Sequence, residues 1–548
     1  MLGYPSGGSA TTVNPIAAQK IYRALYVQDD IHLTRRLTLN LGLRWELDGP
    51  FSERYNRLSF FDPNAVSPLA AATHLNVMGK LGLVDSRDRS SRNNFNADYW
   101  QFGPRAGIAY QVLKNTVVRA GYGIFWLPGL QTGATGPDAD SLNTYATPMI
   151  TSTNGGLTPF SMFSNPFPNG LAQPPGRSPN YQTLLYGLGI ATELPDNPPP
   201  YTQQWNFNIQ QQLPGNLLLD AAYAAARGVR LYIPTFISDQ LPPQDMSLGS
   251  QLLQSVPNPF YGLIANGTLA QPTVTYNQFL RPFPEYGGVN LIGRNLGDSI
   301  YHSFQLKLEK RFGAGGSLLV SYTNAKLISN VDSVTPWLEV GQALPQNFYN
   351  LRGERSLAAF DTPQRLAASY VLDLPFGSGK RLLGNVRGVG GKLISGWGLD
   401  GVLTLERGFP LFITTSQNTS NAFAGTARPN ENGQDPAIRG GSAVSRLSKW
   451  FNTADFTQPA AFTFGNSPRT LPNVRSEGIG NLDLALFKTT RFGPEDKLGL
   501  QFRTEVFNLT NRVQFGYPGM VFGTAQFGVV SSQINQPRLI QLALRFTF

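Results

Sequence analysis

The sequence predicts an all-β protein, an antiparallel β-barrel that spans a membrane. Three observations predict this fold class. The composition combines 57 Gly and 41 Pro with 11% aromatic and only 14% charged residues, which favours turns and strands over helices. Apolar and polar residues alternate along many segments. Tight connections between these segments alternate with long ones, as in membrane barrels with short inner turns and long outer loops.

The clearest alternating segment is 37–47, "LTLNLGLRWEL", where five leucines and Trp45 share one parity and polar residues take most of the other. Period two over this length indicates a strand with one apolar and one polar face, because a helix would scatter the leucines around its surface. A tilted strand needs about 9–11 residues to cross the hydrocarbon layer, and the segments have about that length. The thirteen predicted strands are 22–33, 37–47, 102–112, 116–126, 202–213, 217–226, 301–312, 317–328, 363–374, 396–407, 482–492, 497–509 and 538–548.

The connections support a barrel over a soluble β-sandwich or propeller, which also contains period-two strands. Rows of Gln, Asn, Arg and Glu on the polar faces suit a water-filled interior, and the alternation of tight and long connections persists along almost the whole chain. The tight connections are 34–36, 113–115, 214–216, 313–316 and 493–496. The long ones are 48–101, 127–201, 227–300, 329–362, 408–481 and 510–537, whereas 375–395 is a medium connection where a tight one is due.

Several kinds of chemistry are excluded or unsupported. The chain has no cysteine, so disulfides, thiol catalysis, zinc fingers and iron–sulfur clusters are excluded. Its net charge of +10 is spread along the chain without a basic run, so nucleic acid is not an expected partner. The three histidines occur in separate segments and form no metal-ligand pair, and "GSGKRL" at 377–382 lacks the spacing of a phosphate loop. We expect no enzyme activity, no metal and no cofactor.

The polar face of the predicted sheet carries the candidate wall residues. Arg44 and Glu46 are two residues apart on one strand, and Arg503 and Glu505 repeat that spacing on another. Two roles remain open for such pairs, namely salt-bridge ladders that stiffen the wall and contacts to a ligand. The residues predicted to face the lumen are Arg44, Glu46, Gln501, Arg503, Glu505 and Arg545. Ligand-binding residues are not assigned, and the loops 127–201 and 408–481 are the best candidates by position.

Several strings resemble the barrel of TonB-dependent outer-membrane receptors, most closely the Oar-like group. They are "YVQDDIHLTRRLTLNLGLRWE" (26–46), "RAGYGIFW" (119–126), "DTPQRLAASYVLDLPFG" (361–377), "LDLALFKTTRF" (482–492), "LQFRTEVFNLTNRVQFG" (500–516) and the ending "LIQLALRFTF". The resemblance covers most of the chain from about residue 21 and implies a barrel of about 22 strands with an N-terminal plug. It also implies uptake of a scarce nutrient with energy passed through TonB, which grips a short N-terminal box. The sequence departs from this pattern, because we find no signal peptide, TonB box, plug or regulatory domain.

These departures predict that the chain is the C-terminal portion of such a receptor. If the tight turns face the periplasm, the last strand ends there, and counting back thirteen strands makes 22–33 run inward too. Residues 1–20 are then the remnant of an extracellular loop, and 21–548 form the C-terminal part of the barrel. Direct closure would pair 22–33 with 538–548 in parallel, which is rare among barrels.

The last ten residues predict an assembly signal. Ile540, Leu542, Leu544, Phe546 and Phe548 form one apolar stripe that ends on an aromatic ring. In outer-membrane barrels such an ending resembles the signal read by the barrel-assembly machinery. We expect the first four of these side chains to face lipid and Phe548 to lie at the periplasmic rim.

The expected function is the barrel portion of a TonB-dependent receptor in the outer membrane of a Gram-negative bacterium, inactive in transport without the missing plug. The alternative is a passive porin-like or structural barrel. Expected partners are outer-membrane lipid and lipopolysaccharide, the barrel-assembly machinery, and a nutrient ligand that the sequence does not identify. TonB is expected only through the missing N-terminal part.

Overall fold

The computed structural model describes residues 3–4, 7–128, 141–152, 158–313, 315–332 and 344–548. All thirteen predicted strands are confirmed. They are β3 (Tyr22–Thr34), β4 (Leu37–Asp48), β8 (Gln101–Leu113), β9 (Thr116–Trp126), β12 (Tyr201–Leu213), β13 (Leu217–Ile237), β16 (Gly288–Arg311), β17 (Gly316–Ser329), β19 (Gln364–Asp373), β20 (Trp397–Glu406), β24 (Ile479–Phe492), β25 (Leu498–Phe507) and β27 (Leu539–Thr547). Among the described residues, no helix is long and apolar enough to cross a membrane.

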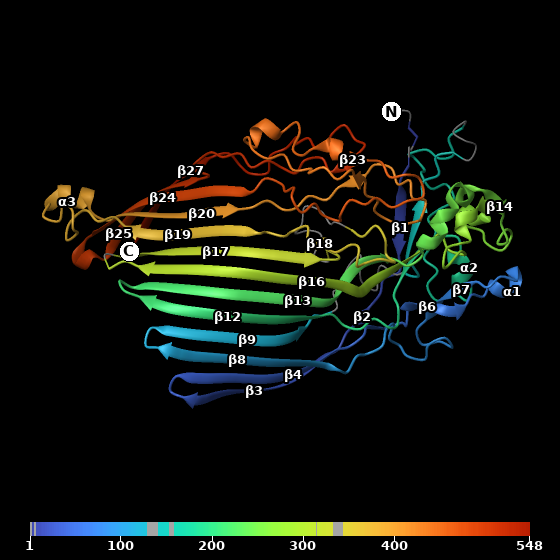
Figure 1. Ribbon diagram of the computed structural model, residues 1–548, viewed down its shortest axis with the longest axis horizontal. Coiled ribbons are helices and arrows are strands. Elements are labelled where there is room, and N and C mark those ends of the chain that lie inside the picture. The colour runs from blue at the N-terminus through green and yellow to red at the C-terminus, as the bar shows by residue number, and fades with distance from the viewer. Residues whose placement is uncertain (1–2, 5–6, 129–140, 153–157, 314, 333–343) are drawn as a thin grey trace.

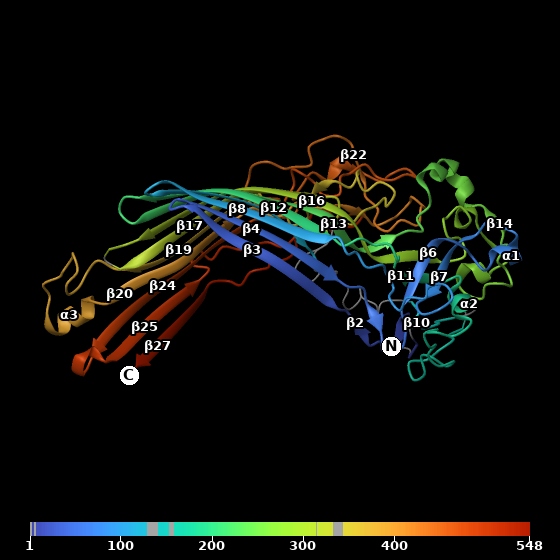
Figure 2. The same cartoon turned by 90° about the horizontal axis from the view of Figure 1, so that it is seen from below.

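Each of these strands pairs antiparallel with the next one along the chain, in one sheet that runs from β3 to β27. Two short strands join it at one end: β11 (Gly189–Thr192) pairs parallel with β16, and β18 (Ser356–Leu357) pairs antiparallel with β17. The sheet curves into an arch. Its two outermost strands, β3 and β27, both lie toward the open side of the arch and do not pair with each other (Figures 1 and 2). Within the part of the chain that is described, the sheet is therefore open.

The two ends of the sheet differ, as the connections predict. We call the end with the short turns the turn end and the opposite end the loop end. The 375–395 connection, which the sequence marks as longer than its neighbours, holds helix α3 (Gly388–Ile394) and projects from the turn end (Figure 1). The turn between β24 and β25 holds η8 (Pro494–Asp496). Both β3 and β27 run from the loop end to the turn end (Figure 1).

Strand register aligns the alternating residues into two continuous faces. Leu544 of β27 lies opposite Phe502 of β25, which lies opposite Lys488 of β24, and Lys488 lies opposite Trp397 of β20. We call this the apolar face and the other the polar face. Lys488 belongs to the apolar face but lies near the turn end, where its Nζ donates to the carbonyls of Lys392 and Ser395 at 2.7 and 2.6 Å. The ammonium group thus points away from the apolar surface toward the turn, as the ammonium group of a lysine does at a membrane interface.

The loop end carries the remaining helices and strands. These are β1 (Ser9–Val13), β2 (Ala18–Gln19), β5 (Ser52–Glu53), β6 (Ser59–Val66), α1 (Ala70–Thr73), β7 (Met78–Leu83), β10 (Thr144–Pro148), α2 (Tyr181–Leu185), η3 (Pro243–Leu253), β14 (Ser255–Pro257), η4 (Gly267–Ala270), β15 (Thr273–Thr275), η5 (Tyr276–Gln278), β21 (Thr414–Thr415), β22 (Asn430–Glu431), η6 (Val444–Arg446), η7 (Thr453–Asp455), β23 (Phe456–Thr457) and β26 (Val521–Phe522). β1 pairs with β10, and β2 pairs with β5. The N-terminal residues therefore lie among the loops.

The buried hydrophobic clusters of the protein lie mostly in these loops rather than in the sheet. The largest cluster joins the connections after β4, β9 and β13 and contains Phe61, Leu142, Tyr181, Phe260 and Tyr286 among others. A second cluster joins the connections after β20 and β25 around Leu411, Trp450, Phe451, Phe456 and Leu471. Loops of this length need their own cores, because the loop backbone would otherwise lose conformational entropy without compensating contacts.

Candidate functional site: the polar face and the packed loops

The polar face carries a charge network around Arg503 at the middle of β25. Its guanidinium binds Asp400 of β20 with two parallel hydrogen bonds of 2.7 and 2.8 Å, and its Nε donates to Glu505 at 2.6 Å. β24 lies between β20 and β25, so the side chain of Arg503 reaches across one strand. A groove of about 350 Å³ follows this network and is lined by Asp400, Asp483, Arg503 and Glu505 together with uncharged residues.

A similar pair lies near the other edge of the sheet. The Nε of Arg44 donates to Glu46 on the same strand, and its Nη2 donates to the hydroxyl of Tyr22 on β3 at 2.8 Å. Both pairs have the geometry of ladders that stiffen a wall. Their side chains are only partly exposed, and each carboxylate has a cationic partner. Whether any of them also contacts a ligand stays a prediction.

The two other predicted wall residues lie side by side at the β27 edge. Gln501 lies directly opposite Arg545 in the β25–β27 register. Its amide Nε2 donates to the hydroxyl of Thr489 on β24 at 3.0 Å. Arg503, Gln501 and Arg545 therefore share the polar face, as their parity predicts, and their orientation toward a lumen stays a prediction.

The C-terminal stripe occupies the apolar face of β27. Its side chains are exposed, with fractions of 66% for Leu542, 69% for Leu544 and 97% for Phe548. Phe546 stacks on Phe548 with ring centroids 6.0 Å apart. Ile540 continues the stripe opposite Val506 of β25. Their role as an assembly signal stays a prediction.

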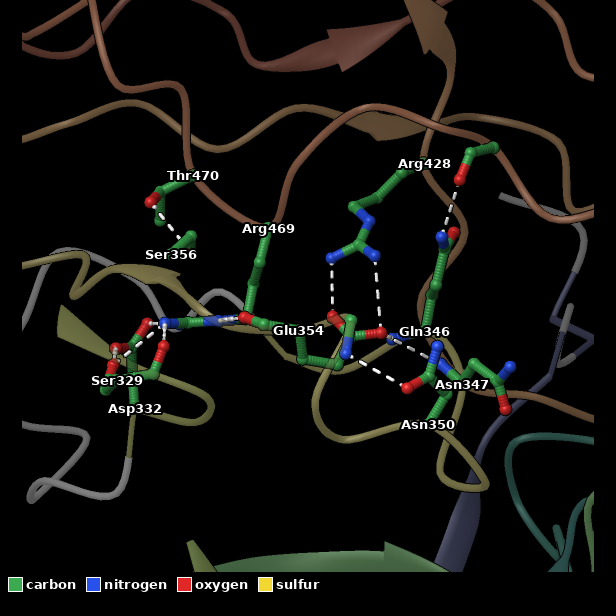
Figure 3. A network of polar contacts seen from close by, with 12 residues as sticks. Ser329, Asp332, Gln346, Asn347, Asn350, Glu354, Ser356, Arg428, Arg469 and Thr470 are labelled. Carbon is green, nitrogen blue, oxygen red and sulfur yellow. Dashed lines mark hydrogen bonds and ion pairs between the residues drawn. The ribbon is translucent and has the colours of Figure 1, made fainter. Parts of the chain in front are cut away.

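The candidate ligand loops are packed against their neighbours. Part of 127–201 lies outside the described residues; its described part contributes α2, β11 and several side chains to the largest hydrophobic cluster. The loop 408–481 is fastened to the loop after β17 by buried ion pairs (Figure 3). These contacts make both loops parts of one scaffold at the loop end.

The centre of that scaffold is Arg469, which is buried together with Asp332. The Arg469 Nη1 lies 2.6 Å from Asp332 Oδ2, its Nη2 donates to the backbone carbonyl and hydroxyl of Ser329 at 2.9 and 2.8 Å, and its Nε donates to the carbonyl of Glu354 at 3.0 Å (Figure 3). The carboxylate of Glu354 in turn accepts two hydrogen bonds from Arg428, at 2.6 and 3.2 Å. Two arginines from one loop thereby hold the neighbouring loop in place.

A third buried pair holds the loop after β13. Arg281 Nη2 lies 2.5 Å from Asp239 Oδ2, and the guanidinium carbon lies 4.1 Å from the ring centroid of Phe423 in the loop after β20. Close by, Glu285 is completely buried, and this burial raises the pKa of its carboxyl to about 8. At neutral pH this side chain is therefore largely protonated and neutral.

The three buried ion pairs were not predicted from the sequence. Arg469 and Asp332 are 137 residues apart, and Arg428 and Glu354 are 74 apart, so no local spacing reveals them. The only sequence signal for these ion pairs was that the loops, which are otherwise rich in Gly, Pro, Asn and Ser, contain several arginines. Among the described residues, no group of three or more His, Cys, Asp or Glu side chains is placed to hold a metal ion.

The comparison with protein families agrees with the architecture. The sequence model of a family described as "Outer membrane beta barrel domain" matches residues 1–541. No curated protein matches the chain. Similar solved structures include the outer membrane transporter YddB from Escherichia coli (10% identity, 96% of this chain and 45% of that chain, TM-score 0.43) and the ferric yersiniabactin uptake receptor FyuA from Yersinia pestis (10%, 97%, 46%, 0.40). The ferripyoverdine receptor of Pseudomonas aeruginosa is a third (10%, 97%, 39%, 0.39). The chain spans less than half of the length of each of these three.

Proposed function

Because the chain belongs to the family of outer-membrane β-barrel domains, we propose that it forms the C-terminal part of the wall of a TonB-dependent receptor that imports a scarce nutrient. The sequence strings that resemble the Oar-like group support this proposal. Its role is transport rather than catalysis, and it acts only together with the N-terminal part that carries the plug and the TonB box.

The observation that carries the proposal is the direction of the two free edges. Both β3 and β27 run from the loop end to the turn end (Figure 1). An antiparallel neighbour must run the opposite way, so the missing set of strands begins and ends with a strand that runs toward the loop end. Such a set contains an odd number of strands. The resembled receptors have about 22 strands, which leaves about nine, an odd number.

The edges also argue against a pore built from this chain alone. A strand edge in hydrocarbon exposes backbone N–H and C=O groups that cost several kcal/mol each when unpaired. β3 has 13 residues and β27 has nine, so each edge exposes several such groups. Joining the two edges directly makes a parallel seam, and the arch in Figure 2 keeps them apart. The passive porin is therefore the weaker hypothesis.

We propose further that the nutrient meets the barrel at the loop end, where the packed loops surround the outer opening of the polar face. The buried ion pairs support this role, because a rigid rim loses less conformational entropy on binding than a mobile one. The barrel-assembly machinery is the proposed partner of the C-terminal stripe.

The test is to express the missing N-terminal part together with this chain. Genomic DNA upstream of the coding sequence is read, and any segment that encodes a plug and about nine strands is expressed together with this chain in a Gram-negative host. We expect heat-modifiable migration on gels and resistance to protease only when both parts are present. A closed, protease-resistant barrel formed by the chain alone, with ion conductance in planar bilayers, would refute the proposal and favour the porin.

A further inference from the structure

A basic pocket lies at the loop end, between the outer ends of β19, β20 and β24 and the loop segment 437–450. Its volume is about 920 Å³. Six arginines and two glutamates line it, and no other charged residue does. The arginines are Arg365, Arg407, Arg439, Arg446, Arg475 and Arg512. Neither the charge network of the polar face nor the buried ion pairs of Figure 3 include any of these arginines.

The floor of this pocket includes residues of the apolar face of the sheet. Tyr322, Leu366 and Leu405 line it, and they lie opposite one another on β17, β19 and β20. The register continues from Leu405 to Gly480 of β24, on the face that carries the C-terminal stripe. Gly480 leaves room for the Arg512 guanidinium, which occupies the position that a Cβ would take. The pocket therefore opens beside the surface predicted to face lipid.

Four of the arginines already have carboxylate partners, which leaves two with an unmatched charge. The pairs are Arg365 with Glu406, Arg439 with Asp435, Arg475 with Asp361 and Arg512 with Glu477. Among the described residues, neither Arg407 nor Arg446 forms an ion pair. The pocket is thus a preformed positive site rather than a balanced network.

Arg446 is held in position by its surroundings. Its guanidinium carbon lies 4.9 Å from the ring centroid of Trp450, and its Nη1 donates to the carbonyl of Ile438 at 3.2 Å. Its Nε is buried and has no hydrogen-bond partner among the described residues. A buried donor without a partner costs free energy, and an anionic oxygen in the pocket would satisfy it.

We propose that this pocket binds the phosphorylated headgroup of a glycolipid of the outer leaflet, the lipid A part of lipopolysaccharide. Guanidinium groups bind phosphate through paired, charge-assisted hydrogen bonds. The apolar floor accepts the start of the acyl chains, which a free phosphate or a phosphopeptide does not have. A nutrient on its way through the barrel would instead follow the polar face. The proposal requires only the outer-membrane location and is independent of transport.

The test compares two variants of the full chain extracted from outer membranes in detergent. The double variant Arg407→Gln/Arg446→Gln removes the two unmatched charges. The matched control is Arg352→Gln/Arg355→Gln, which changes two exposed arginines outside the pocket. Binding is measured with purified lipopolysaccharide, with the same lipid after enzymatic dephosphorylation, and with inorganic phosphate. Circular dichroism establishes that each variant keeps the β structure of the unchanged chain.

We expect the double variant to bind lipopolysaccharide at least about tenfold more weakly than the control, because each charged hydrogen bond contributes more than a tenfold change in affinity. Dephosphorylated lipid should bind the unchanged chain as weakly as lipopolysaccharide binds the double variant. Inorganic phosphate should compete only at millimolar concentration. Equal binding by the double variant and the control, or equal binding of the two lipids, overturns the proposal. Full competition by micromolar phosphate overturns it too and identifies a free anion as the ligand. None of these results depends on uptake, so they leave the proposed function untouched.

Discussion

The substitution Arg469→Met tests whether the loops form one rigid scaffold. Methionine keeps much of the length of the arginine side chain but removes all of its donors. Asp332 then stays completely buried without the partner that now lies 2.6 Å away. The carbonyls of Ser329 and Glu354, which accept from the same guanidinium, lose their partner as well.

The expected loss is about 3–5 kcal/mol of local stability, because removing one partner of a buried ion pair leaves an uncompensated charge in a poorly hydrated site. This corresponds to roughly a hundredfold to a few thousandfold rise in the opening equilibrium of the loop. The loss should be confined to the loop end. The strands keep their hydrogen bonds, and none of the residues that accept from Arg469 takes part in the register of β20, β24 or β25.

Hydrogen exchange measured by mass spectrometry separates these regions. Peptides that cover 344–363 should exchange faster by the stated factor, and peptides from β24 and β25 should not change. The control Arg439→Gln removes an exposed pair with Asp435 and should leave exchange unaltered, because solvent already screens that pair. The double variant Arg469→Met/Asp332→Leu should recover most of the protection. Unchanged exchange at 344–363 in Arg469→Met would refute the rigid scaffold.

Three further outcomes are expected. In cells that also express the N-terminal part, Phe548→Ala should lower the amount of folded protein in outer-membrane fractions several-fold without changing its synthesis, as measured by heat-modifiable migration; equal amounts would remove the assembly role from the last ring. Glu285 has a pKa raised by burial to about 8 in the folded loops, so its contribution to stability is fully present below its ordinary pKa and is lost as the pH rises through about 8. Chemical denaturation should show a slope of up to about 1.4 kcal/mol per pH unit that Glu285→Gln removes; identical slopes would contradict this. Leu542→Lys should cost about 2–4 kcal/mol in lipid vesicles and Ala543→Lys much less, because lipid contacts only the apolar face; equal costs would exclude that face as the lipid surface.

The strands were predictable because a barrel strand encodes its two environments residue by residue. In 37–47 the leucines and the polar residues alternate without interruption, and the observed strand β4 (Leu37–Asp48) agrees to within one residue. The outward extensions of β13 and β16 were not predicted. β13 reaches Ile237 and β16 begins at Gly288, beyond the predicted segments 217–226 and 301–312. There both faces of the strands contact other loops, so the alternation that marks a strand is lost.

The candidate site was predictable only where its partners lie close in the sequence. The spacing of Arg44 and Glu46 places both side chains on one face of one strand, and the structure brings them together. The partner of Arg503 on β20 was not predictable, because Asp400 lies 103 residues away and the choice depends on strand order. The same holds for the basic pocket, whose arginines come from one strand and two loops. Charge that is scattered in the sequence is concentrated by the fold.

The distribution of buried residues follows from the two environments of the molecule, namely hydrocarbon around the strands and water around the loops. Leu544 is 69% exposed on β27, a liability in water that disappears where the surroundings are hydrocarbon. Such a strand derives its stability from paired backbone groups and from lipid, so the sheet needs no core of its own. The loops stand in water and cannot use lipid, and they bury apolar residues such as Phe451 and charged pairs such as that of Arg469. The basic pocket lies where these two regions meet, with residues of the apolar face below it and loop arginines around it. A phosphorylated glycolipid matches that boundary, because its charged headgroup lies in water and its acyl chains lie in hydrocarbon.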